Sequence, residues 1–223
     1  MKYLYILLTL VSIEIILQIG YAIKYPKDDP FEGMAHERVA TDRVICVGDS
    51  IVWGAGASSK KKSFPSQLSK LMGYETVRNL GSLSATSEDT LHLIRKISHY
   101  TSGTIIVHTG YNDDKVPSNH GLRKSMIVRL LMKPFPRRKQ NMEDWKHTME
   151  SIVVACEDKN IPVRFLKIST ANKNKRIEEM NAWVARHYWD IPITLKPEHF
   201  VNEIHLNDEG YAEMARQVAE GLK

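Results

Sequence analysis

Short runs of apolar, largely β-branched residues alternate with longer segments in which apolar positions recur at helical spacing, from about residue 43 to the end of the chain. The short runs predict strands and the longer segments predict helices. We predict strands at Arg43–Gly48, Glu75–Asn79, Thr104–His108, Val163–Ile168 and Ile191–Leu195. We predict helices at Phe64–Met72, Glu88–Ser98, Leu122–Met132, Met142–Lys159, Lys175–Tyr188 and Asp208–Leu222. Because strands and helices alternate, the pattern predicts a doubly wound α/β fold with a parallel sheet of about five strands, covered on both faces.

The chain opens with a different pattern, an almost uninterrupted apolar run from Leu4 to Ile23. A helix of this length is about 30 Å long, which matches the hydrocarbon core of a bilayer. A cleavable signal peptide is the alternative, but its apolar region usually has only about 7 to 15 residues. The pattern therefore favours a retained anchor. We divide the chain into an N-terminal membrane anchor at 1–23, a tether at 24–37 and a folded domain at 38–223.

The anchor also bears on location. We expect a single N-terminal helix in the membrane and the folded domain on the extracytoplasmic side, or a secreted domain if the helix is cleaved. The charges that flank the apolar run are balanced and do not themselves set the orientation.

Composition narrows the class of protein. A chain of 223 residues with 43% hydrophobic and 26% charged residues is neither a disordered polymer nor a polytopic membrane protein. Cys46 and Cys156 are too few for a disulfide framework or a cysteine-based zinc site. Apart from His199 and His205, the histidines fit no metal-ligand spacing. We therefore expect no metal. The glycine-rich segment Gly54–Lys60 lacks the third glycine of a dinucleotide loop and the ending of a Walker motif, so we also expect no cofactor.

Positive charge is concentrated in one segment. The chain has 31 Lys and Arg residues against 26 Asp and Glu residues, but eight of the basic residues and no acidic residue lie between Asp114 and Glu143. The rest of the chain is therefore slightly acidic. A local basic segment is poor evidence for a nucleic-acid-binding fold, so we expect no nucleic-acid partner.

Residues 122–139 carry most of this charge around an apolar stripe. Leu122, Met126 and Leu130 recur at helical spacing, with basic residues between them. An amphipathic basic helix of this kind suits a surface that lies against anionic lipid headgroups, and it would also attract an acidic polysaccharide. The alternative is a lid that packs its leucines on the folded domain.

Polar clusters follow several of the predicted strands and precede the last helix. The clusters are Gly48-Asp49-Ser50, Asn79-Leu80-Gly81-Ser82-Leu83-Ser84, Gly110-Tyr111-Asn112-Asp113 and Asn202-Glu203-Ile204-His205. Because ligands of doubly wound folds bind at the carboxyl ends of the strands, we expect these clusters to converge. A serine at a strand-to-helix turn exposes its hydroxyl, a histidine in reach can take the proton, and an asparagine amide can donate to a developing oxyanion.

The clusters resemble the sequence blocks of the SGNH (GDSL) hydrolases. The similar blocks are Gly48-Asp49-Ser50, the segment from Asn79 to Thr86, Gly110-x-Asn112-Asp113, and His205 followed by Leu206-Asn207-x-x-Gly210-Tyr211. They occur in order and span about residues 43 to 218, most of the predicted domain. The family comprises esterases, lipases, thioesterases and carbohydrate O-acetyl esterases or acetyltransferases. The resemblance implies a flavodoxin-like three-layer α/β/α fold and chemistry without a metal.

The resemblance also implies a role for each residue of the site. Ser50 would be the nucleophile and His205 the base that takes its proton. The backbone N–H groups of Ser50 and Ser84 and the side-chain amide of Asn112 would donate to the oxyanion. Asp49 would shape the turn rather than react.

Two positions depart from the family's pattern. Ser84 stands where the family usually has a glycine, so we expect an added side chain to crowd the pocket. Asn202 stands where the family usually has an aspartate. We expect the Asn202 carbonyl to accept from the His205 ring N–H and orient the base, without a charge to stabilise imidazolium; the same exchange in a serine-protease triad costs about 10⁴ in turnover. Glu203 and Glu198 are alternative sources of a carboxylate.

The sequence thus predicts a serine-dependent ester hydrolase that acts on an acyl or acetyl ester, of a surface glycan or lipid, through a Ser50 acyl-enzyme. A catalytically weak module that binds a glycan or a partner on the same fold is one alternative. An O-acyltransferase that uses Ser50 and His205 while excluding water is another.

Overall fold

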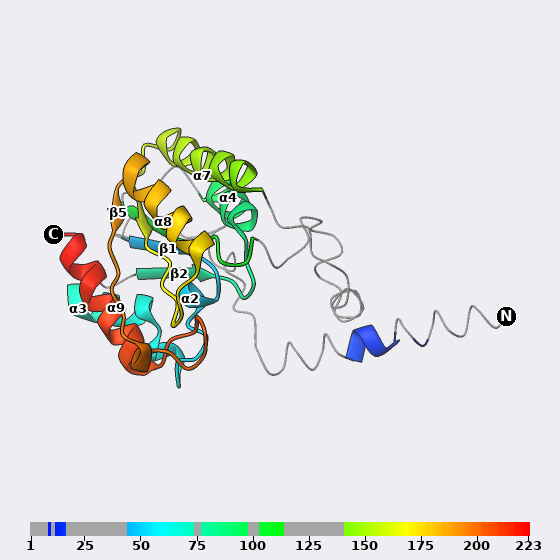
Figure 1. Ribbon diagram of the computed structural model, residues 1–223, viewed down its shortest axis with the longest axis vertical. Helices are drawn as coiled ribbons and strands as arrows, with labels where there is room; N and C mark the ends of the chain where they lie inside the picture. Colours follow the sequence, from blue (N-terminus) through cyan, green and yellow to red (C-terminus); the bar gives the residue numbers. More distant parts are fainter. Residues whose placement is uncertain (1–8, 10–11, 17–43, 74–76, 98–102, 114–140) are drawn as a thin grey trace.

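The computed structural model describes residues 9, 12–16, 44–73, 77–97, 103–113 and 141–223 (Figure 1). The strands are β1 (Val44–Gly48), β2 (Val77–Gly81), β3 (Thr104–His108), β4 (Val163–Leu166) and β5 (Asp190–Ile191). The helices are α2 (Ser50–Trp53), α3 (Phe64–Met72), α4 (Ser87–Lys96), α7 (Met142–Glu157), α8 (Lys175–His187) and α9 (Asp208–Gly221), with 3-10 turns η1 (Lys60–Lys62) and η2 (Pro197–His199). The five strands pair in parallel in the order β2-β1-β3-β4-β5. This order is the flavodoxin-like one and confirms the predicted fold class.

Helices cover both faces of the sheet (Figure 1). α3 and α9 pack against each other on one face, and α4, α7 and α8 lie on the other. Trp145 of α7 contacts Trp183 of α8 edge to face, with ring centroids 5.5 Å apart. β1 and most of β3 are fully buried between the two helical layers. The predicted three-layer α/β/α arrangement is therefore confirmed.

Two strands are shorter than their apolar runs. The fourth ends before Ile168 because the Asn181 side chain bonds the backbone of that residue, accepting from its N–H at 2.9 Å and donating to its carbonyl at 2.8 Å. The fifth, predicted at Ile191–Leu195, covers only Asp190–Ile191. Pro192 follows directly, and proline has no N–H to give to a strand ladder.

The second strand, predicted at Glu75–Asn79, extends two residues beyond Asn79 to Gly81. Its parallel register with β1 aligns Gly81 with Gly48, so that both strands end at the same edge of the sheet. Asn79 therefore belongs to the strand, is exposed, and accepts from the N–H of Gly81 at 2.9 Å.

Five predicted helices fall on described residues, and all five are present with ends within two residues of the prediction. Asn141 and Asn207 cap α7 and α9, each accepting from a backbone N–H of the first turn. The short helix α2 was not predicted, because four residues are too few to show a helical period.

The predicted anchor, tether and basic helix fall almost entirely outside the described residues. Of the first 43 residues, the structure describes Thr9 and Ser12–Ile16, which are helical. Within the described part of the chain, no helix is both long and apolar enough to cross a membrane. The anchor and the helix at Leu122–Met132 stay predictions.

Candidate active site

Ser50 stands where the first strand ends. It follows β1 by two residues and is the first residue of α2. Asp49 caps this helix, since its Oδ1 accepts from the N–H of Ile51 at 2.9 Å. Ser50 is 8% exposed. The turn therefore holds the serine in a defined place that still reaches the surface.

Gly48 lets the ends of β1 and β3 come close together. A Cβ at this position would lie 1.9 Å from the carbonyl oxygen of His108, and the φ angle of 151° is one that other residues rarely adopt. β1 and β3 are neighbours in the sheet although β2 lies between them in the chain. This is the topological switch point of the fold, where doubly wound proteins bind their ligands.

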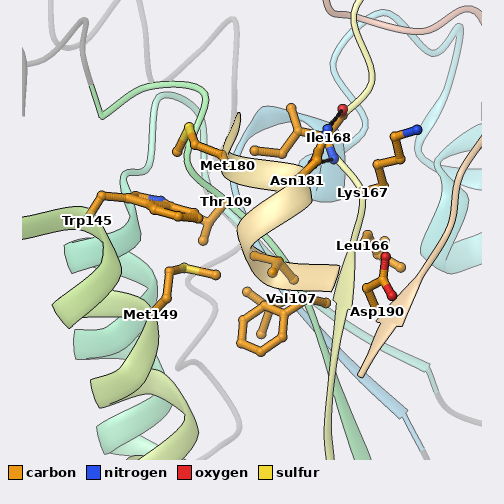
Figure 2. Close-up of a pocket in the computed structure, with 12 residues that line it drawn as sticks. Val107, Thr109, Trp145, Met149, Leu166, Lys167, Ile168, Met180, Asn181 and Asp190 are labelled. Carbon is orange, nitrogen blue, oxygen red and sulfur yellow. Dashed lines mark hydrogen bonds between the residues drawn. The ribbon is translucent and has the colours of Figure 1, made fainter. Parts of the chain in front are cut away.

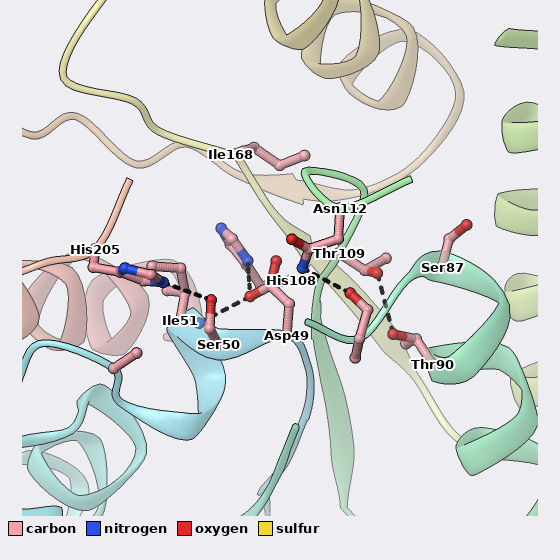
Figure 3. A network of polar contacts seen from close by, with 12 residues as sticks. Asp49, Ser50, Ile51, Ser87, Thr90, His108, Thr109, Asn112, Ile168 and His205 are labelled. Carbon is pink, nitrogen blue, oxygen red and sulfur yellow. Dashed lines mark hydrogen bonds and ion pairs between the residues drawn. The ribbon is translucent and has the colours of Figure 1, made fainter. Parts of the chain in front are cut away.

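His205 contacts Ser50 across 155 positions of the chain. Its Nε2 lies 2.9 Å from the Ser50 Oγ (Figure 3). A tight turn presents the histidine, because the N–H of Val201 donates to the His205 carbonyl at 2.8 Å. Gly56, with a φ angle of 98°, packs the loop after α2 against this turn, since a Cβ there would lie 2.4 Å from the carbonyl oxygen of Leu206. The two residues predicted as nucleophile and base are therefore brought together.

Asn202 contacts His205 with a different atom from the one expected. The Asn202 Oδ1 accepts from the N–H of Ile204 at 3.1 Å and from the N–H of His205 at 2.9 Å. These two donors fix the orientation of the amide, so its nitrogen, Nδ2, faces the His205 Nδ1 at 3.1 Å. The expectation that the carbonyl accepts from the ring N–H is wrong, because the backbone of the turn already uses that oxygen.

This contact determines the tautomer of His205. An amide nitrogen donates and does not accept, so Nδ1 must carry the lone pair and Nε2 the proton. The Nε2–H then donates to the Ser50 Oγ. In this tautomer the ring orients the hydroxyl but does not take its proton.

Asn112 follows β3 and joins two of the polar loops. Its side-chain amide donates to the carbonyl of Ala85 at 2.9 Å, next to Ser84 (Figure 3). An amide group has two N–H bonds, so one can hold the loop while the other meets a ligand. The loops that carry the three predicted oxyanion donors, at Ser50, Ser84 and Asn112, thus lie at one edge of the sheet.

Ser84 has a backbone conformation that favours glycine. Its φ angle is 59°, in the left-handed region, where an L side chain costs roughly 1 to 2 kcal/mol. The residue is half-buried. The loop therefore keeps the geometry of a glycine position although a serine occupies it.

We expect Ser84→Gly to raise the free energy of unfolding by about 0.5 to 1 kcal/mol. Glycine removes the backbone strain of a left-handed φ, and this gain exceeds the cost of the backbone entropy that glycine adds to the unfolded chain. Urea unfolding measures the difference. Ser82→Gly is the matched control, since Ser82 is an exposed residue of the same loop without a positive φ, and glycine there should destabilise. A Ser84→Gly variant less stable than wild type would contradict this account.

Asp113 anchors the loop after β3 to the start of α4. Both of its carboxyl oxygens accept from the N–H of Ser87, at 3.2 and 3.1 Å, and the Ser87 hydroxyl contacts it as well. Burial raises the pKa of the Asp113 carboxyl to about 7, against the opposing hydrogen bonds of Ser87 and the charge of Arg176. A protonated Asp113 can in turn donate to the Ser87 hydroxyl, so this contact needs no buried charge.

A second histidine, absent from the predicted site residues, lies beside Ser50. The His108 Nδ1 is 3.0 Å from Asp49 Oδ1, and the two side chains are 2% and 1% exposed. The sequence signal was a histidine at the end of an otherwise apolar strand, at the ligand-binding edge of the sheet. Its partner depends on the register of β1 and β3, which the sequence does not specify.

Other reactive groups lie away from this edge. Among the described residues, no cluster of three or more His, Cys, Asp or Glu side chains could hold a metal ion. Burial raises the pKa of the Cys46 thiol, and it raises that of Cys156 to about 12. Both thiols are therefore protonated and poor nucleophiles at neutral pH.

A pocket lies between α7, α8 and the sheet (Figure 2). Its walls include Trp145 and Met180, and none of the predicted site residues lines it. It lies behind the loop that carries Asn112, because a Cβ at Gly110 would meet Met180 Cε at 2.7 Å. Met180 of the pocket wall thus packs against the start of that loop, and the pocket is separate from the Ser50–His205 contact.

The sequence matches no protein-family model and no curated protein. The structure is similar to a lipolytic protein of the G-D-S-L family from Desulfitobacterium hafniense, with a TM-score of 0.59 and 16% identity over 80% of this chain and 98% of that one. It is similar to a GDSL-like lipase from Bacteroides thetaiotaomicron, with a TM-score of 0.56 and 16% identity over 92% and 97%. It is also similar to an acetyl xylan esterase, with a TM-score of 0.59 and 12% identity over 81% and 100%.

The strand order and these similarities define the class: the chain has the SGNH (GDSL) hydrolase fold. At such low identity the likeness establishes the fold alone. The particular chemistry of this chain rests on Ser50, Asn112 and His205 at the sheet edge, with Asn202 on the far side of the histidine ring.

Proposed function

We propose that the chain is a serine-dependent ester hydrolase of the SGNH type. The observation that carries the proposal is the 2.9 Å contact between Ser50 Oγ and His205 Nε2 at the switch point of the sheet. The Ser50 oxygen bonds to the ester carbonyl carbon, the alcohol leaves, and water hydrolyses the resulting acyl-enzyme. The N–H groups of Ser50 and Ser84 and the Asn112 amide donate to the carbonyl oxygen as it becomes negative.

The proposed substrate is an acyl or acetyl ester of a glycan or lipid. Support comes from the similar structures, which include an acetyl xylan esterase and a two-domain esterase active on acetylated mannans. The second shows a TM-score of 0.59 and 16% identity over 87% of this chain and 52% of that one. The predicted anchor at 1–23 also bears on the substrate, because a domain tethered to a membrane lies close to esters carried on the cell surface. We therefore propose a surface glycan or lipid as the carrier of the ester.

The wild-type chain should turn over slowly. Asn202 directs an N–H toward the ring of His205, which leaves Nε2 protonated and the Ser50 hydroxyl without a base at that position. In a serine-protease triad, an asparagine that stabilises the wrong tautomer lowers turnover by about 10⁴, while oxyanion donors and binding still give some catalysis.

The same contact supports a second candidate, a binding module that holds an acylated glycan at the sheet edge without cleaving it. An unactivated Ser50 hydroxyl would then serve as a hydrogen-bonding group for the ligand. An O-acyltransferase is a variant of the enzyme proposal, in which an alcohol takes the acyl group from Ser50 in place of water.

Hydrolysis of p-nitrophenyl acetate by the full-length chain tests the proposal. We expect slow release of p-nitrophenol above the spontaneous rate, because the oxyanion donors act even when the base is weak. Acetyl transfer to an added alcohol in preference to water would favour the acyltransferase. No release by either wild type or Asn202→Asp would favour the binding module and contradict the enzyme proposal.

A further inference from the structure

His108 lies against the turn that holds the nucleophile. Its Nδ1 is 3.0 Å from Asp49 Oδ1, the same oxygen that accepts from the N–H of Ile51 at 2.9 Å. Two donors on one carboxylate oxygen place the imidazole ring beside the first turn of α2, next to Ser50 (Figure 3). The role proposed above for Ser50 and His205 makes no use of this pair.

The carboxylate determines which nitrogen of His108 carries the proton. A carboxylate only accepts hydrogen bonds, so Nδ1 carries the proton and, in the neutral ring, Nε2 has the lone pair. His205 has the opposite arrangement, because its Nδ1 faces the N–H group of Asn202. The tautomer that a general base requires is therefore found on His108 and not on His205.

Asp49 favours a positively charged partner. Its Oδ2 is buried and, within the part of the chain that the structure describes, has no hydrogen-bond partner. A buried carboxylate with an unpartnered oxygen stabilises a positive charge that develops close by during the reaction. A proton that arrives on the Nε2 of His108 during acylation would create that charge, because the ring is 3.0 Å from the carboxylate.

The second nitrogen of His108 faces the site. In Figure 3 it points away from Asp49, into the space between His205 and Asn112. The described residues offer it no hydrogen-bond partner, and the Ser50 hydroxyl bonds to His205 instead. A water molecule that bridges Nε2 and the Ser50 hydroxyl would relay a proton between them.

We propose that His108 is a catalytic base of this site and acts on Ser50 through one water molecule, a role that rests on the proposed ester hydrolysis. As the Ser50 oxygen bonds to the carbonyl carbon, its proton passes to the water, and a proton of that water passes to Nε2 of His108. As the bond to the leaving oxygen breaks, Nε2 returns its proton to the water, and a proton of that water passes to the leaving oxygen, so that the alcohol departs neutral. His205 stays neutral and keeps its hydrogen bond to Ser50.

The variant His108→Asn removes the proposed base but keeps the structural contact to Asp49. The asparagine amide nitrogen takes the place of Nδ1 and can keep the hydrogen bond to Asp49, whereas no atom replaces Nε2. In the wild-type background we expect kcat for p-nitrophenyl acetate to fall about 100-fold, the size of a general-base contribution. In the Asn202→Asp background, where His205 can accept the proton, we expect a change within about threefold.

An unchanged rate in the wild-type background, or an equal loss in both backgrounds, would overturn the proposal, because an equal loss is what a purely structural role produces. If His108→Asn does not fold, nitrogen NMR of the histidine rings in the wild-type chain decides. We expect the proton on Nδ1 of His108, and a proton on its Nε2 would overturn the proposal. A wild-type rate that survives Ser50→Ala would instead mean that the proposed function has failed.

Discussion

Replacing Asn202 by aspartate is expected to raise kcat for p-nitrophenyl acetate by about 10³ to 10⁴. The Asn202 oxygen accepts from the backbone N–H groups of Ile204 and His205, and the amide nitrogen faces the ring. A carboxylate can keep both backbone hydrogen bonds with one oxygen and offer the other to Nδ1. The ring proton then moves to Nδ1, and Nε2 can accept the Ser50 proton over the 2.9 Å contact.

The gain should appear in kcat and leave KM little changed, because Asn202 acts on the His205 ring and not on the substrate. Glu203→Gln is the matched control, since it removes the adjacent carboxylate and keeps the turn, whose contact to Ala171 uses the Glu203 backbone carbonyl. We expect no change in its rate. An Asn202→Asp variant no faster than wild type, or a Glu203→Gln variant that loses activity, would contradict the tautomer assigned to His205.

The second large effect is expected from Ser50→Ala in the Asn202→Asp background, where the activity to be lost is greatest. We expect kcat to fall by about 10⁴ or more, because no acyl-enzyme can form and only the oxyanion donors and binding remain. The initial burst of p-nitrophenol that accompanies acylation should also disappear.

Ser58→Ala serves as the control for removing a serine hydroxyl nearby. Ser58 lies in the loop after α2, but its hydroxyl donates to Asp208 at 2.6 Å, away from His205. We expect this variant to retain the rate of its Asn202→Asp parent. Full activity of Ser50→Ala would mean that another group attacks the ester, and the role assigned to Ser50 would be wrong.

Much of the fold was predictable because it follows from where apolar residues lie. Buried parallel strands read as continuous apolar runs, and the helices between them show their own period. The predicted ends of β4 and β5 were wrong because, at each of them, a single side chain decides which hydrogen bonds the backbone makes. Asn181 takes the backbone groups of Ile168, and Pro192 cannot extend β5.

The sequence predicted which residues form the site better than it predicted the hydrogen bonds between them. Ser50 and His205 were assigned from the strand-end rule and the family resemblance, and the structure brings them to 2.9 Å. The orientation of the Asn202 amide could not be predicted from the sequence. It depends on the backbone N–H groups of the turn, which donate to the amide oxygen and so leave the amide nitrogen facing His205. The His108–Asp49 contact likewise depends on the pairing of β1 with β3.

The central claim is that Ser50 is a nucleophile, and covalent labelling with a fluorophosphonate tests it most directly. We expect one adduct per chain, located on the peptide that contains Ser50, formed slowly in wild type, faster in Asn202→Asp and not at all in Ser50→Ala. An adduct on any other residue, or none in the Asn202→Asp chain, would contradict it.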